Sequence, residues 1–108
     1  MEIQELIMEV DSANHSDFLK REVSVLHFFS DWQMDCLMSM PIFESLAEEF
    51  CDKIFFGRVN IEENEEIADK YQVQKVPLIL VFKNGEIIDR IHGCDCEEVL
   101  REKIELLF

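Results

Sequence analysis

The stretch VSVLHFFSDWQMDCLMSMP, from Val23 to Pro41, joins a strand pattern to a helix pattern with little between them. Its first seven residues are mostly branched or aromatic, which is typical of a strand buried on both faces of a sheet. Farther along, apolar side chains recur at spacings of three and four, which predicts a helix with one apolar stripe. That stripe comprises Cys36, Met40, Phe43, Ala47 and Phe50. We therefore expect a central strand over Glu22–Ser30, followed by a long helix over Met34–Cys51 that Pro41 kinks.

The rest of the chain alternates strand and helix patterns. Ser12 or Asn14 is available to cap the first short helix. An Asn84-Gly85 pair between two apolar runs predicts a tight hairpin turn. The other expected elements are strands over Glu5–Val10, Lys53–Asn60, Leu78–Phe82 and Ile87–His92, and helices over Ala13–Arg21, Asn64–Gln72 and Asp95–Leu107. The order βαβαβαββα predicts an α/β domain with a mixed central sheet and helices on both of its faces.

Length and charge limit the classes of function. The 108 residues suit a single domain over residues 1–108. A net charge of −14 repels phosphate backbones and anionic lipid, so we expect no nucleic-acid and no membrane partner. The longest apolar run, Leu78–Phe82, is far too short to cross a bilayer. The first residues, MEIQELIMEVD, lack the positive start of a secretory signal, so we expect a cytoplasmic protein. We also expect this acidic protein to be a monomer.

The four cysteines, at positions 36, 51, 94 and 96, are not spaced like a secreted disulfide framework or a paired zinc site. We expect no resident metal and no other cofactor. In the cytoplasm thiols are kept reduced, so any disulfide of this chain would be functional or transient.

Several motifs in this order resemble the thioredoxin family over nearly the whole chain, from about Val10 to the C-terminus. The first is VLHFFSDW, which ends at Trp32. The second is the cysteine and the proline that follow it, Cys36 and Pro41. The third is the run VNIEENEEIADKYQVQKVPLILVFKNGE. The resemblance implies a thioredoxin fold, a cis peptide bond between Val76 and Pro77, and an active-site turn directly after the tryptophan.

That turn departs from the family pattern where the chemistry is carried. The family turn is usually C-G-P-C: the thiolate of the first cysteine attacks a substrate disulfide, and the second cysteine resolves the mixed disulfide. Here the turn reads Gln33-Met34-Asp35-Cys36, and an amide cannot attack sulfur. The resemblance therefore implies that no disulfide closes within the turn and that ordinary dithiol reduction is absent or weak.

Three further positions differ from the family. A buried aspartate of the second strand is matched by His27, a nearby lysine by Arg58, and a threonine after the cis-proline by Leu78. Together these differences indicate that the proton-handling groups of the dithiol reaction have been removed or rebuilt.

Three cysteines remain candidates for thiol chemistry. We expect Cys36 to lie one turn into the long helix, facing inward, either as a vestigial thiol that fills core space or as a monothiol activated by His27. Cys94 and Cys96 open the last helix, and the resemblance places Cys94 on the rim of the active-site turn. The candidate redox pairs are Cys36 with Cys94 and Cys94 with Cys96.

In this family the backbone before the cis-proline pairs with an extended substrate segment, and that pairing needs no thiol. The expected peptide-binding face comprises Trp32, Gln33, Met34, Val76, Pro77 and Cys94. A Cu(I) site formed by Met34, Cys36 and Cys94 is a weaker alternative. The leading hypothesis is a thioredoxin-like protein that binds an extended peptide or a partner protein. The rival is a thiol-disulfide oxidoreductase of cell redox homeostasis.

Overall fold

Five strands form one mixed sheet in the computed structural model, which describes residues 6–32, 34–50, 52–92 and 97–106, with the backbone alone at residues 34–37 and 39. The strand order is β1-β3-β2-β4-β5. The elements are β1 (Ile7–Glu9), α2 (His15–Phe18), β2 (Val23–Phe29), α3 (Met34–Phe50), β3 (Phe55–Asn60), α4 (Glu65–Lys70), β4 (Leu78–Lys83), β5 (Glu86–His92) and α5 (Glu97–Glu105). The predicted α/β fold, with this order of elements, is confirmed.

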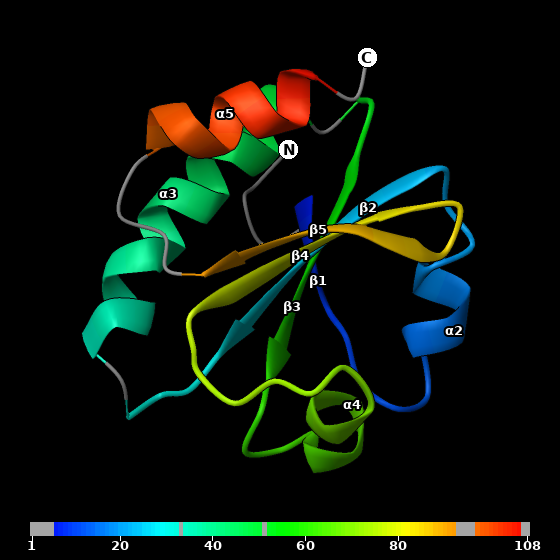
Figure 1. Cartoon of the computed structure of the whole chain (residues 1–108), viewed down its shortest axis with the longest axis vertical. Helices are drawn as coiled ribbons and strands as arrows, with labels where there is room; N and C mark the ends of the chain where they lie inside the picture. Colours follow the sequence, from blue (N-terminus) through cyan, green and yellow to red (C-terminus); the bar gives the residue numbers. More distant parts are fainter. Residues whose placement is uncertain (1–5, 33, 51, 93–96, 107–108) are drawn as a thin grey trace.

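Strand β2 lies at the centre of the sheet, and all seven of its residues are buried. It pairs parallel with β3 and antiparallel with β4. Strand β1 pairs parallel with β3, and β5 pairs antiparallel with β4. Helices α3 and α5 cover one face of the sheet, and α2 and α4 cover the other (Figure 1). A strand that is apolar nearly throughout therefore occupies the position where both of its faces are covered.

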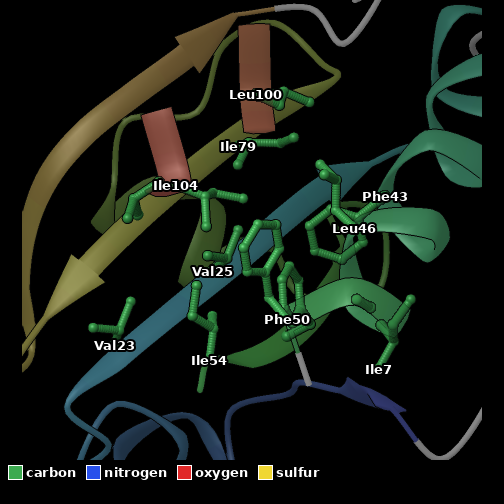
Figure 2. Close-up of a cluster of buried hydrophobic side chains, with 13 residues drawn as sticks. Ile7, Val23, Val25, Phe43, Leu46, Phe50, Ile54, Ile79, Leu100 and Ile104 are labelled. Carbon is green, nitrogen blue, oxygen red and sulfur yellow. The ribbon is translucent and has the colours of Figure 1, made fainter. Parts of the chain in front are cut away.

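The core beneath α3 and α5 joins side chains from both helices to the odd-numbered positions of β2 and β4. Figure 2 shows Phe43, Leu46 and Phe50 of α3 pointing toward the sheet. Of the predicted apolar stripe, Phe43, Ala47 and Phe50 are buried and Met40 is half-buried. Pro41 lies inside α3 with its ring exposed.

The opposite core is closed by two short helices. Its buried members are Val10, Phe18, Leu26, Phe28, Val59, Ile67, Leu78, Leu80 and Phe82. Gly57 of β3 lies among them: a Cβ atom there would come within 2.8 Å of Val10 Cγ2 and 2.9 Å of Phe18 Cζ. The absence of a side chain at Gly57 therefore lets β1 and α2 pack closely on β3.

Helix α2 is much shorter than the predicted Ala13–Arg21. The Asp11 carboxylate accepts hydrogen bonds from the backbone N–H groups of Ala13 and Asn14, at 2.9 and 3.0 Å. Asp11 thus orders the turn that precedes the helix, and the Asn14 side chain, which accepts from the backbone N–H of Asp11 at 2.9 Å, makes no capping hydrogen bond to the helix. The helix then ends at Phe18, where the chain turns to enter β2.

Helix α4 ends at Lys70, before the predicted limit at Gln72, because Gln72 has a φ angle of +55° and cannot continue a right-handed helix. The hairpin follows the prediction closely. Asn84 and Gly85 have φ angles of +52° and +85°, the combination that a tight turn of this type requires. Among the residues described, no helix is both long and apolar enough to span a membrane.

Candidate functional site

The turn after β2 is held by a small set of polar contacts. The Ser30 hydroxyl donates to Glu62 Oε1 at 2.6 Å and accepts from the backbone N–H of Trp32 at 3.3 Å. Asn60 Nδ2 donates to the Asp31 carboxylate at 3.2 Å. These contacts fix the chain that leads to α3 and direct the indole of Trp32 outward, where it is 83 % exposed. A large aromatic group this exposed contributes little to the core and suits contact with another molecule.

The sheet topology brings the two ends of the predicted peptide-binding face together. Phe28, near the end of β2, pairs with Leu78 at the start of β4, and Leu78 pairs in turn with His92 at the end of β5. Trp32 and the Val76–Pro77 pair therefore extend from the same end of the sheet.

The peptide bond between Val76 and Pro77 is cis, Pro77 is buried, and Val76 is half-buried. Gln74 and Lys75 are exposed. Within the described part of the chain, no backbone hydrogen bond involves Gln74, Lys75 or Val76. This segment, which we call the open segment (Gln74–Val76), therefore presents main-chain donors and acceptors to solvent.

His27 lies deep beneath this site. It is 1 % exposed, it pairs with Arg58 of β3 and Ile79 of β4, and its ring centroid lies 4.9 Å from that of Phe43. Burial, and to a lesser extent the charge of the nearby Arg58 guanidinium, lower the pKa of His27 to about 4. The imidazole is therefore neutral near pH 7, and a pKa this low makes it a poor acceptor for a thiol proton.

Arg58 has a partner of its own. Its guanidinium forms an ion pair with the Glu9 carboxylate across β1 and β3. The two side chains line an open hollow of about 270 Å³ at the carboxyl ends of β1, β2 and β3. The remaining lining residues are Phe29, Asp31, Met40, Asn60 and Glu63. Arg58 is thus tied to the sheet edge by Glu9, an interaction the sequence pattern did not indicate.

Several predicted site residues lie outside the described part of the structure. Gln33, Cys94 and Cys96 are among them, and Met34 and Cys36 are placed by their backbone in the first turn of α3. The pairing of Cys36 with Cys94, that of Cys94 with Cys96, the activation of Cys36 by His27 and the Cu(I) site all stay predictions. In the described part of the chain, no three His, Cys, Asp or Glu side chains are grouped to hold a metal ion.

The residues that shape the turn were missed by sequence reasoning. Ser30, Asn60 and Glu62 each lie at or just beyond the carboxyl end of a parallel strand, where polar side chains of neighbouring strands meet. Their positions at these strand ends were the sequence feature from which the contacts could have been predicted.

The thioredoxin family model matches residues 6–106. This chain belongs to the thioredoxin family. A thioredoxin of Staphylococcus saprophyticus is 32% identical over 99 residues, which cover 92% of this chain and 95% of that protein. The chloroplastic thioredoxin M4 of Arabidopsis thaliana is 35% identical over 96 residues, which cover 88% of this chain and 50% of that protein. The solved structure of a Malassezia sympodialis thioredoxin superposes with a TM-score of 0.85 at 26% identity, covering 93% of this chain and 89% of that one.

Proposed function

We propose that this thioredoxin-family domain binds an extended peptide, or an extended segment of a partner protein, and does not carry out ordinary dithiol reduction at the turn after Trp32. One observation carries the proposal. The open segment, whose main chain makes no backbone hydrogen bond within the described structure, lies at the same end of the sheet as the exposed Trp32.

Each half of this face suits a different part of a peptide. The open segment can pair with an extended backbone as an additional strand would, which gives affinity without regard to sequence. The indole of Trp32 offers a broad apolar surface for one side chain of the ligand, and a buried aromatic anchor commonly dominates such an interface. Binding of this kind requires no sulfur.

Two features argue against the ordinary reaction. Glutamine stands at position 33, directly before α3, where the helix dipole would stabilise a thiolate if a cysteine stood there. The buried group beneath the turn is His27, whose pKa of about 4 keeps it neutral and weakly basic near pH 7. The reaction would lack both its attacking sulfur and an effective proton acceptor.

Charge points to the class of partner. The chain carries a net charge of −14, and Asp31, Glu62 and Glu63 lie near the turn that leads to Trp32. Such a field raises the association rate of positively charged ligands and disfavours acidic ones. We therefore expect the bound segment to be basic as well as extended. A reducing compartment such as the cytoplasm fits a role that uses no disulfide.

A second function is favoured by the relatives, which are named thioredoxins. In that case the chain would be a thiol-disulfide oxidoreductase with displaced cysteines. Its reactive pair would be Cys36 with Cys94 or Cys94 with Cys96.

The two functions are separated by an assay in which dithiothreitol is the reductant and the rate at which the protein catalyses insulin reduction is measured. The wild-type chain is compared with a variant in which all four cysteines are serine, and with the Staphylococcus saprophyticus thioredoxin as a positive control. We expect the wild type and the cysteine-free variant to be equally inactive. A wild-type rate close to that of the positive control would refute the proposal. Rapid, reversible closure of one specific cysteine pair after mild oxidation, detected by peptide mapping, would support the second function.

Binding is tested by selecting ligands from a displayed library of random peptides. We expect enrichment of peptides with basic residues, and we expect them to shift the backbone amide resonances of the open segment and the indole resonance of Trp32. Failure to enrich any peptide, or shifts confined to other surfaces, would refute binding at this face.

A further inference from the structure

Tyr71 is held by contacts from four separate elements, α2, β2, β4 and β5. Its hydroxyl and Nε2 of His15 on α2 lie 2.6 Å apart in a hydrogen bond, and the two rings meet edge to face at 5.3 Å. Its backbone carbonyl accepts a hydrogen bond from Arg90 Nη1 of β5 at 3.0 Å. Its ring also packs edge-on against Phe28 and Phe82, with centroids 6.3 and 5.5 Å away. Both the side chain and the main chain of Tyr71 are therefore fixed.

Two hydrogen-bonded residues, Gln72 and Val73, connect Tyr71 to the open segment. The N–H groups of Gln72 and Val73 donate to the carbonyls of Asp69 and Ala68, at 3.1 and 2.9 Å. After Val73, backbone pairing within the described structure resumes only in β4, which begins at Leu78. The path of the open segment is thus determined by the Tyr71 anchor at one end and by Pro77 and β4 at the other.

His15 is unusual at this position because it is a polar side chain that is 6 % exposed on a four-residue helix. Its ring contacts the side chain of Tyr71, which lies 56 residues farther along the chain. A helix this short has little stability of its own, so α2 depends on contacts such as this one. The hydrogen bond therefore joins a weakly stable element to a residue that lies three positions before the open segment.

We propose that the hydrogen bond between Tyr71 and His15 makes both of them positioning residues for the peptide-binding edge, holding the open segment where its main chain can pair with a ligand. This inference rests on the proposed function. The ring of Tyr71 supplies apolar packing by itself, whereas its hydroxyl acts through His15. Removal of the hydroxyl alone should therefore disturb the segment and leave the core in place.

The variants separate positioning from stability. Tyr71→Phe removes only the hydroxyl, and His15→Phe removes its partner. His15→Gln retains a group that can bond the hydroxyl and is the rescue variant. Val25→Ala is the matched control. Val25 belongs to the opposite core beneath α3 and does not contact Tyr71, so its truncation lowers the stability of the protein without touching the Tyr71 contacts. Urea unfolding of each variant records how much stability is lost.

The first readout needs no ligand: it is the set of backbone amide resonances of Gln74, Lys75 and Val76 in the free protein, together with the hydrogen-exchange rates of Gln72 and Val73, whose N–H groups are hydrogen-bonded. We expect Tyr71→Phe and His15→Phe to shift the resonances and accelerate exchange, and His15→Gln and Val25→Ala to leave both near wild type. Unchanged resonances and exchange rates in Tyr71→Phe would overturn the proposal.

The second readout is the affinity of peptides selected on the wild type. We expect Tyr71→Phe and His15→Phe each to weaken binding about fivefold, and the double variant to bind as each single variant does, because the two residues act as one unit. Equal affinity in Tyr71→Phe and wild type would overturn the positioning role. If the wild type binds no peptide, the proposed function fails, and with it the ligand-pairing role. The amide data of the free protein then still decide whether Tyr71 positions the segment.

Discussion

Lowering the pH from 7 to 5 should destabilise the folded domain through His27, because protonation of this side chain places a charge in the centre of the sheet. The side chain is 1 % exposed, and the ring centroids of Phe29 and Phe43 lie 6.0 and 4.9 Å from that of His27. The pKa of His27 is lowered from 6.5 to about 4, first by burial and second by the charge of Arg58. Folding therefore opposes protonation of His27.

The sign and size of the effect follow from the two pKa values. Between pH 6.5 and pH 4 the unfolded chain binds more protons at His27 than the folded chain does, so the free energy of unfolding falls as the pH falls. The contribution of His27 is complete above about pH 6.5 and is lost progressively toward about pH 4. A gap of about 2.5 between the pKa values corresponds to about 3 kcal/mol, of which about 2 kcal/mol is lost by pH 5.

Urea unfolding at a series of pH values measures this loss, with circular dichroism as the signal. Fluorescence is less suitable, because Trp32 is already 83 % exposed in the folded state. The control variant is His27→Leu, which has a similar volume and does not titrate. Other groups, His15 among them, titrate in both proteins and cancel in the comparison.

The wild type should lose about 2 kcal/mol more than His27→Leu between pH 7 and pH 5. Equal pH dependence in the two proteins would refute the reasoning. So would a pKa near 6.5 for His27, measured by following its ring proton resonances in the folded protein.

Three further changes have expected outcomes. Gly57→Ala should lower the free energy of unfolding by about 1–3 kcal/mol in urea, because the new methyl group meets Val10 and Phe18 at under 3.0 Å; unchanged stability would contradict this packing. Trp32→Ala should leave that free energy within about 0.5 kcal/mol of wild type, since the indole is exposed, yet weaken the binding of selected peptides; unchanged affinity would remove Trp32 from the site. Gln33→Cys should gain slow insulin reduction, and a rate equal to that of the Staphylococcus saprophyticus thioredoxin would show that the replaced proton-handling groups are dispensable.

Much of the fold could be predicted from local patterns. The seven-residue run of β2 is apolar enough to require cover on both faces, and the stripe through Phe43, Ala47 and Phe50 identifies the face of α3 that supplies this cover. Asn84 and Gly85 predict the hairpin because few residues tolerate positive φ angles. These features depend on near neighbours in the sequence, so the sequence is enough to reveal them.

The limits of the short helices could not be predicted in the same way. Helix α2 begins after a turn made by the Asp11 side chain, although Ser12 and Asn14 are equally good capping residue types. Helix α4 stops because Gln72 adopts a left-handed conformation, which nothing in a glutamine indicates. In both cases tertiary packing selects one of several locally acceptable conformations.

The same difference holds for the candidate site: residues in local motifs could be predicted, whereas contacts between distant residues could not. Trp32 and the Val76–Pro77 pair could be named from sequence because a family motif marks each of them. The contact between Tyr71 and His15 could not, since 56 residues separate them and no periodicity connects them. The same is true of the ion pair between Glu9 and Arg58, which depends on the register of β1 against β3.

The register shift between β4 and β5, beside Val81 and Phe82, has a consequence for the behaviour of the protein at high concentration. A flat outer strand is a template on which further copies of a chain can add and grow into fibres. Here the shift interrupts the regular pairing of β5, the charged Glu86 and Arg90 lie along that strand, and the other outer strand, β1, has only three residues. These features oppose edge-to-edge pairing between copies, even though Ile87 and Ile88 of β5 are partly exposed. Stacking of further copies onto the outer strands is thus disfavoured, and the proposed pairing with a peptide would take place at the open segment, away from both outer strands.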